Sequence, residues 1–288
     1  MGKYSIKKLE QLSGVKAHTL RIWEKRYKLL NPERTSTNIR YYSDEELRKL
    51  LNIALLYNKG EKISKVASYD HEQLLTAVKQ IEDHHLLNRS RVDDLTMASL
   101  AYDSIRISKL YDQYLEELGI EQTFVEVLLP FLERVGLLWL SEEMNPSQEH
   151  LVSNLIRQKI ISATEDLPNN FEQNAILFLP EGEYHEIGLL FFSYLFKKHG
   201  IHVFYLGASV PSFHVKELSN VKDIDIILTY SVVKGKEDLE SFFDSLKEFK
   251  SKEIYFIESK NQTGLLLRYP SNIIKLKGYE GVLQLIKQ

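Results

Sequence analysis

The sequence contains no cysteine, which excludes disulfides, thiolate metal sites and cysteine nucleophiles. No apolar run approaches the roughly 20 residues that a membrane-spanning helix needs. The first residues, MGKYSIKKLEQ, lack the apolar core of a secretory signal. The patterns GxxxxGKS/T, GxGxxG, HExxH and GxSxG are also missing, so nothing indicates an NTPase, a dehydrogenase, a zinc protease or a hydrolase. We therefore expect a cytoplasmic protein that is not an enzyme.

Positive charge is concentrated at one end of the chain. The formal net charge of the 288 residues is −3, yet residues 1–75 carry 15 Lys and Arg against 9 Asp and Glu. A basic segment ahead of an acidic remainder suits contact with phosphates, although such an excess is also common on ordinary surfaces. Charge alone therefore only permits a nucleic-acid partner.

Two short helices joined by a turn are predicted near the N-terminus. Ser5 is a plausible N-cap for the first helix, and Gly14 ends it. Leu20, Trp23 and Tyr27 form the apolar stripe of the second helix, and the spacing indicates a helix-turn-helix. Polar side chains outside this stripe are candidates for base-edge or phosphate contacts: Lys16, His18, Thr19, Arg21, Lys25 and Arg26.

A polar stretch comes next, NPERTSTNIRYYSDEEL, and it predicts a β-hairpin wing and then a helix capped at Ser43. Its basic and aromatic side chains are further candidates for DNA contacts: Arg34, Arg40, Tyr41 and Tyr42. The alternative is a small helical domain that binds protein.

Residues 4–67 resemble a MerR-type winged helix-turn-helix through TLRIWEKRY, the PER turn, RYYS and the closing ISKVA helix. The resemblance implies that the helix at 16–26 reads base edges in a double-stranded operator, while Leu20 and Trp23 belong to the core. It also implies a homo-oligomer, with RNA polymerase as a further candidate partner. Residues 70–87 are short for a long dimerising helix, so a dimer or tetramer is expected to depend on the residues after 87.

From about residue 92 to 166, apolar residues recur every three or four positions in four segments, which predicts a four-helix bundle. Breaks are expected at Gly119 and at Asn145–Pro146, and a kink at Pro130.

One spacing in the bundle is unusual: Trp139-x9-Glu149-His150. An indole at one helix end and a Glu-His pair opening the next could cap a flat ligand. The alternative is that Trp139 fills the bundle core while Glu149 and His150 face water.

After residues 168–170 the spacing of apolar residues changes, and short apolar runs alternate with helical stretches. This pattern predicts a flavodoxin-like, doubly wound parallel sheet that binds ligands at the carboxyl ends of its strands. GEYHEIG (182–188) follows the first strand there, and LGASVP (206–211), which contains Ser209 as a candidate contact, follows the second.

Glu183-x-His185-x-x-Gly188 on such a sheet, behind the bundle pattern, resembles the cobalamin-binding pair of domains. Nearly the whole chain is similar to MerR-type regulators related to CarA and CarH. The resemblance implies a cobalamin, adenosylcobalamin foremost, with His185 as the lower axial ligand of cobalt. Glu183 would accept the other ring N–H, Gly188 would let a helix approach closely, and four more side chains would contact the cofactor: Trp139, Glu149, His150 and Ser209.

The sequence departs from that family in two places. Corrinoid domains usually carry a Gly-Gly pair after the fourth strand, which gives room for the nucleotide tail, and here the place reads Ile257, Glu258, Ser259, Lys260. A glutamate there adds bulk and repels a phosphate. Light-sensing relatives carry a histidine directly after the bundle tryptophan, whereas this chain has Leu140, so a second histidine ligand is not expected from that position.

The expected organisation is therefore a winged helix-turn-helix at 1–75, a helical bundle at 76–168 and a flavodoxin-like domain at 172–288. The expected function is sequence-specific transcriptional regulation in response to a ligand, a cobalamin. A cofactor-free regulator that uses the same scaffold for oligomerisation or partner binding is the alternative. A corrinoid carrier protein of a methyltransferase system is a third interpretation, and the helix-turn-helix argues against it.

Overall fold

The computed structural model describes residues 4–35, 38–79, 84–232, 235–249, 252–258 and 267–287, apart from the side chains of residues 79 and 84–86. The chain divides into two compact units, residues 1–152 and 153–288, and each is described by itself. The boundaries expected for three domains stay predictions. Within the described ranges, no helix is long and apolar enough to cross a membrane.

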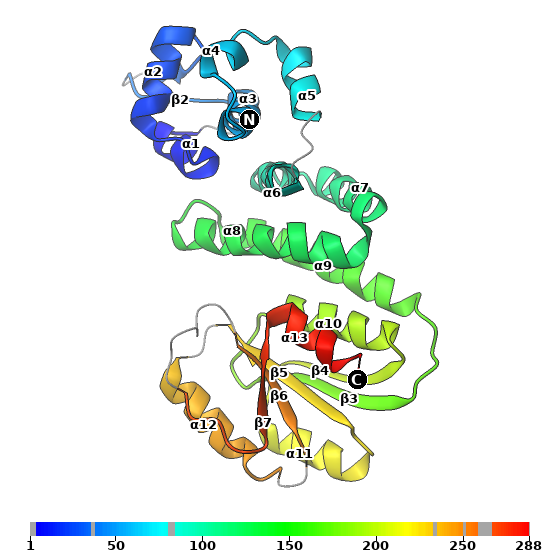
Figure 1. Ribbon diagram of the computed structural model, residues 1–288. Coiled ribbons are helices and arrows are strands. Elements are labelled where there is room, and N and C mark those ends of the chain that lie inside the picture. Colours follow the sequence, from blue (N-terminus) through cyan, green and yellow to red (C-terminus); the bar gives the residue numbers. More distant parts are fainter. Residues whose placement is uncertain are drawn as a thin grey trace. The chain divides into compact units, whose positions relative to one another are not determined.

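The first unit begins with the predicted helix-turn-helix and wing (Figure 1). The Ser5 hydroxyl accepts a hydrogen bond from the N–H of Lys8, and Gly14 ends the first helix in the left-handed conformation, at φ 72°. The Ser43 hydroxyl caps the third helix by accepting from the N–H of Glu46. Both predicted caps and the predicted break are confirmed. The elements are α1 (Ile6–Ser13), α2 (Ala17–Tyr27), β1 (Glu33–Arg34), β2 (Arg40–Tyr41), α3 (Asp44–Asn58), α4 (Ile63–Val66) and α5 (His71–Lys79).

Helices continue as predicted through the middle of the chain. Gly119, at φ 75°, interrupts α7, and α9 begins at Pro146, so both expected breaks are confirmed. The distortion expected at Pro130 lies before it and is a π-helical segment, which leaves Pro130 in the first turn of α8, where a missing N–H is tolerated. The elements are α6 (His84–Leu100), α7 (Ser104–Gln122), η1 (Thr123–Leu128), α8 (Leu129–Leu140) and α9 (Pro146–Glu165).

The second unit contains a parallel sheet in the order β4-β3-β5-β6-β7. Figure 1 shows α10 and α13 on one face and α11 and α12 on the other, which confirms the doubly wound fold. The elements are β3 (Gln173–Pro180), α10 (Ile187–Lys198), β4 (Ile201–Val210), α11 (Ser212–Val221), β5 (Ile226–Ser231), α12 (Lys236–Leu246), β6 (Ile254–Glu258), β7 (Ile273–Lys277) and α13 (Gly278–Leu285).

The strand order reverses at β3, which lies between β4 and β5. The chain leaves β3 toward α10 on one face and leaves β5 toward α12 on the other (Figure 1). The loops that diverge at such a switch point frame the place where doubly wound sheets bind their ligands. The expected site lies here, because residues 181–186 connect β3 to α10.

A close contact brings α10 against β5 beside this loop. The Tyr230 hydroxyl donates to the carbonyl oxygen of His185 and accepts from the N–H of Leu189 at 3.2 Å. A Cβ added to Gly188 would lie 2.8 Å from that hydroxyl oxygen, closer than real Cβ atoms come. A glycine at position 188 therefore lets the helix approach the strand.

Gly188→Ala should lower the free energy of unfolding of the sheet unit by about 1–3 kcal/mol, because the new methyl group displaces Tyr230 or α10. In a Tyr230→Phe background the nearest ring carbon is 3.4 Å away, so the same substitution should cost much less. Urea unfolding of the four proteins, followed by circular dichroism, measures both effects. An equal cost in the two backgrounds would show that the hydroxyl contact is not the cause.

Candidate cofactor site and DNA interface

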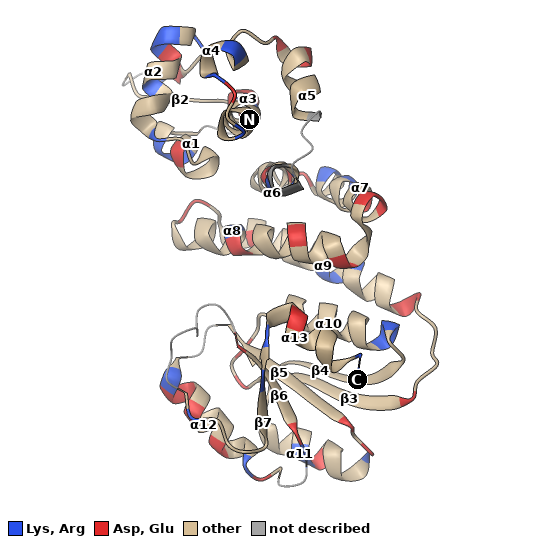
Figure 2. Cartoon of the chain, viewed as in Figure 1, with Lys and Arg blue, Asp and Glu red and all other residues tan. Residues whose placement is uncertain are grey.

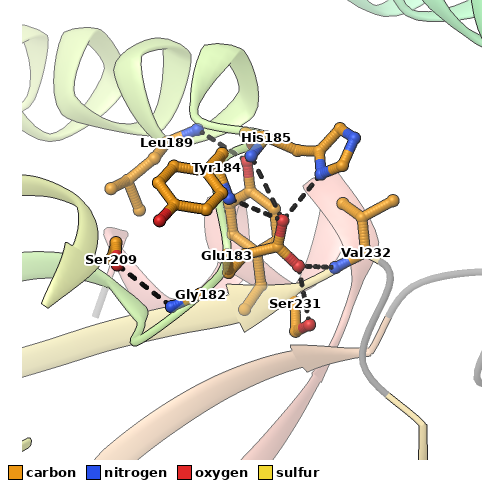
Figure 3. A network of polar contacts seen from close by, with 9 residues as sticks. Gly182, Glu183, Tyr184, His185, Leu189, Ser209, Ser231 and Val232 are labelled. Atoms are coloured by element: carbon orange, nitrogen blue, oxygen red, sulfur yellow. Dashed lines mark hydrogen bonds and ion pairs between the residues drawn. The ribbon is translucent and has the colours of Figure 1, made fainter. Parts of the chain in front are cut away.

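The side chain of Glu183 is fully buried at the switch point and receives hydrogen bonds on both carboxylate oxygens (Figure 3). Oε1 accepts from the N–H of Tyr184 at 3.0 Å, and from the N–H and ring Nδ1 of His185 at 3.2 and 2.7 Å. Oε2 accepts from the hydroxyl of Ser231 at 2.7 Å and the N–H of Val232 at 2.8 Å. Such donors make a buried carboxylate tolerable. Glu183 thus ties the loop after β3 to the end of β5.

These contacts fix the charge of Glu183. Burial by itself raises the pKa of this carboxyl, but hydrogen bonds from the His185 ring, Ser231 and the backbone outweigh it and hold the pKa well below its ordinary range. The group is therefore an ionised carboxylate, which can only accept hydrogen bonds.

The ionised carboxylate also fixes the tautomer of His185. Its Nδ1 must carry the proton that it donates to Glu183, which leaves the lone pair of the neutral ring on Nε2. The side chain of His185 is 58% exposed, so the ring is accessible at the carboxyl edge of the sheet. A carboxylate that holds one ring nitrogen while the other binds a metal is a common arrangement in metalloproteins.

No group of three or more His, Cys, Asp or Glu side chains forms a metal site among the residues that the structure describes. His185 alone could not hold a free metal ion, since protein sites usually supply three or more ligands. It does fit a metal that arrives with its other ligands already in place, as in a tetrapyrrole-like ring.

Ser209 forms hydrogen bonds to the loop that follows β3. Its N–H donates to the carbonyl oxygen of Glu183, and its hydroxyl accepts from the N–H of Gly182, both at 3.0 Å. The residue has φ 55°, which is uncommon for a side chain other than glycine. The structure extends β4 through Val210, so Ser209 lies within the strand, and its predicted contact with a ligand stays a prediction.

Three residues of this site were missed from the sequence: Ser231, Tyr230 and Glu186. Glu186 closes the loop by accepting from the Tyr205 hydroxyl and pairing with Arg157, each at 3.1 Å. Ser231 had one usable signal, because it is the last residue of a buried strand at the expected binding edge. Tyr230 and Glu186 had none.

Glu258, where the family usually has glycine, ends β6 beside Ser231 of β5. Its carboxylate forms an ion pair with Nζ of Lys275 at 2.5 Å, so the expected repulsion of a phosphate is offset while the bulk remains. Ser259 and Lys260 lie outside the described residues.

In the first unit, Trp139 lies near the end of α8 and is 51% exposed, whereas its neighbour Leu138 is buried. The alternative that Trp139 fills the bundle core is therefore wrong. Glu149 lies in the first turn of α9 and His150 directly after it, and Oε2 of Glu149 is 2.8 Å from Nδ1 of the largely exposed His150. The loop 141–145 joins the two helix ends, and a role for the three side chains in ligand binding stays a prediction.

The candidate recognition helix is α2. Leu20 and Trp23 are buried, and the Trp23 ring packs edge-on against Tyr57 at 5.0 Å, which confirms their assignment to the core. Of the candidate DNA-contacting side chains, Thr19 is half-buried. Figure 2 shows the Lys and Arg positions of α2 in blue. The other candidates are exposed: Lys16, His18, Arg21, Lys25 and Arg26.

The predicted wing is a β-hairpin formed by β1 and β2. Arg34 is exposed and donates to the side chain of Asn38 at 2.6 Å, while Tyr41 donates to Glu33 at 2.6 Å. Both remain candidates for contacts with a DNA backbone.

Tyr42, also predicted to contact DNA, is fully buried, and this prediction is wrong. Its backbone pairs with Tyr4, and its hydroxyl donates to Oε2 of Glu24 at 3.0 Å. Oε1 of Glu24 pairs with Arg40 at 3.1 Å, so Glu24 connects α2 to the wing. Successive side chains of a strand point to opposite faces, which sends Tyr42 into the core.

Comparison with known proteins identifies two matching family models. Residues 4–73 match the MerR HTH family regulatory protein model, and residues 91–162 match the B12 binding domain model. The chain is 31% identical over 220 residues to the HTH-type transcriptional repressor CarH of Myxococcus xanthus, covering 73% of this chain and 72% of that protein. It is 28% identical over 211 residues to the repressor CarA of the same organism, covering 72% and 69%.

Among solved structures, the chain is similar to the monomethylamine corrinoid protein of Methanosarcina barkeri. The identity is 16%, the TM-score is 0.49, and the match covers 69% of this chain and 99% of that one.

Glu183→Gln should lower the free energy of unfolding at pH 7 by about 2–3 kcal/mol, because an amide nitrogen would face hydrogen-bond donors in a buried place. The folded-state pKa of Glu183 lies below the ordinary value of about 4.3. The stabilisation is therefore complete above that pH and is lost as the pH falls toward the folded-state pKa. Urea unfolding at neutral and acidic pH should show that the difference in free energy of unfolding between wild type and Glu183→Gln becomes smaller in acid.

Glu181→Gln is the matched control, since Glu181 is exposed in the same loop and should matter little. A gap between wild type and Glu183→Gln that is the same at every pH would contradict the assignment of an ionised, stabilising carboxylate.

Proposed function

We propose that this chain regulates transcription by binding DNA and sensing a cobalamin. The chain belongs to the family of MerR-type HTH transcriptional regulators with a B12-binding domain, which includes CarH. The observation that carries the proposal is the buried Glu183 carboxylate, which accepts the Nδ1–H of His185 and so places the ring's lone pair on Nε2, the atom that would bind the metal. A regulator has no need of a catalytic step, so we propose no enzymatic activity.

His185 would bind the cobalt of the cofactor, and Trp139, Glu149 and His150 would be further side chains that contact it. When bound, adenosylcobalamin would supply a cobalt ion that can take a histidine nitrogen as a ligand, together with apolar surface. The accessible indole of Trp139 offers an apolar surface for such a ligand. Ser209 and Gly188 would act indirectly, because they position the loop and the helix beside His185.

The DNA partner would be a double-stranded operator read by α2 and gripped by the wing. One copy of α2 contacts one half-site, so a two-fold operator requires at least a dimer, and a tetramer would bind two such sites. We place the protein in the cytoplasm with its DNA, where RNA polymerase is a candidate partner.

A cofactor signal needs a route to the helix-turn-helix, and the first unit offers one. The Lys8 ammonium group of α1 donates to the carbonyl oxygen of Glu143 at 3.1 Å and pairs with its Oε2 at 2.7 Å. Glu143 lies in the short loop between Trp139 and Glu149. Arg89 of α6 donates to the carbonyl oxygen of Ser13, the last residue of α1, at 3.1 Å. Movement of the loop would therefore pull on α1.

The cofactor proposal is tested by incubating the full chain with adenosylcobalamin in the dark, removing free cofactor and recording the visible spectrum. Wild type should retain the cofactor, and His185→Ala should lose it or show a changed spectrum. His199→Ala is the control, because His199 is an exposed histidine of the same domain. Failure of wild type to retain any cobalamin would favour the cofactor-free regulator, and retention without DNA binding would favour the corrinoid carrier.

The route is tested by removing the ion pair. In the double variant Lys8→Met, Glu143→Gln, the ratio of DNA affinities with and without bound cobalamin should approach one, because α1 is no longer held by the loop. DNA retardation assays measure the ratio. Lys65→Met, which breaks the exposed pair between Lys65 of α4 and Glu61, should leave the ratio unchanged. An unaltered ratio in the double variant would exclude this route.

A further inference from the structure

One apolar side chain of α2 lies outside the core. Ile22 is 53% exposed, whereas Leu20 and Trp23 on the same helix are almost completely buried. An exposed isoleucine on a helix gains nothing from burial, and its branched side chain lowers helix propensity. Single exposed apolar residues are common on proteins, so exposure alone says little. The position of Ile22 on the helix says more.

Ile22 lies at the centre of the polar face of α2. Residues three and four positions away share a face with it, and these positions are His18, Thr19, Lys25 and Arg26. Three of these four side chains are exposed, and all four are candidates for DNA contact. An apolar group is thus surrounded by groups that bind phosphates or base edges.

The partner of this face must therefore be anionic at its rim and apolar at one place near its centre. A DNA major groove that contains thymine has both properties, because phosphates line the groove and thymine alone among the four bases presents a methyl group there. A protein partner would be expected to meet a larger apolar patch than one side chain.

We infer that Ile22 is a specificity-determining residue whose side chain contacts the 5-methyl group of a thymine in each operator half-site. The inference rests on the proposed DNA-binding function and adds the base that this position of the helix selects. Lys25 and Arg26 hold the helix in the groove through charge, and Ile22 distinguishes thymine from the bases that lack the methyl group.

The experiment needs a duplex that the wild-type full chain selects from a pool of random-sequence DNA. Versions of this duplex carry uracil in place of one thymine of each half-site, which removes the methyl group and leaves base pairing intact. Dissociation constants are measured for wild type, Ile22→Ala and Lys25→Ala, each at several salt concentrations. Circular dichroism checks that both variants keep their fold, which the exposure of both side chains favours.

Wild type should lose about fourfold in affinity per half-site at one uracil position, the effect of one buried methyl group. Ile22→Ala should bind the thymine duplex more weakly and be indifferent to uracil at that position. Its salt dependence should match that of wild type. Lys25→Ala should bind every duplex more weakly with a shallower salt dependence, and it should keep the uracil effect.

The inference is overturned if wild type binds every uracil duplex as tightly as the thymine duplex, or if Ile22→Ala keeps the full uracil effect. In both cases the proposed DNA-binding function still holds, because wild type has selected a specific duplex from the random pool. Should wild type select no sequence from the pool, sequence-specific DNA binding fails, and the role of Ile22 fails with it.

Discussion

The buried carboxylate of Glu183 is the constraint on which the candidate cofactor site depends. A charge in that place is tolerable only if donors surround it. The donors come from the loop after β3 and from the end of β5, which the strand order brings together at the switch point. The requirement for partners therefore sets the shape of the loop after β3. One of the donors is the His185 ring, so the interaction that stabilises the loop also sets which ring nitrogen carries the proton.

In the helix-turn-helix, another glutamate likewise connects two elements through both of its carboxylate oxygens. Glu24 accepts from Tyr42 and pairs with Arg40, so the helix that would enter the groove and the wing that would flank it are held by one side chain. Lys8 and Arg89 then connect this domain to the neighbouring helices through Glu143 and the carbonyl oxygen of Ser13. A regulator needs such contacts, because a ligand can change DNA affinity only through groups that differ between two arrangements.

Local patterns in the sequence predicted much of this arrangement, because caps, apolar periods and strand–helix alternation act over a few residues. Ser5, Gly14, Gly119 and the parallel strands were all foreseen for that reason. Contacts that depend on which strands lie side by side leave little local trace. The hydroxyl of Tyr230 was missed for that reason, and that of Ser231 was missed although its place at the end of a buried strand was a signal. Tyr42 was misassigned because the sequence of a wing does not reveal which of two adjacent tyrosines points inward.

The central claim is that Nε2 of His185 binds cobalt, and electron paramagnetic resonance of the bound cofactor in its cobalt(II) form tests it most directly. The chain would be prepared with natural histidine and with histidine labelled with nitrogen-15 in the ring. If His185 is the ligand, its coordinated nitrogen splits each cobalt hyperfine line of the spectrum. The splitting is into three lines with natural histidine and into two with labelled histidine, and this change on labelling is absent in His185→Ala. A three-line pattern that labelling does not alter would mean that the cofactor's own base occupies that position, which contradicts the account.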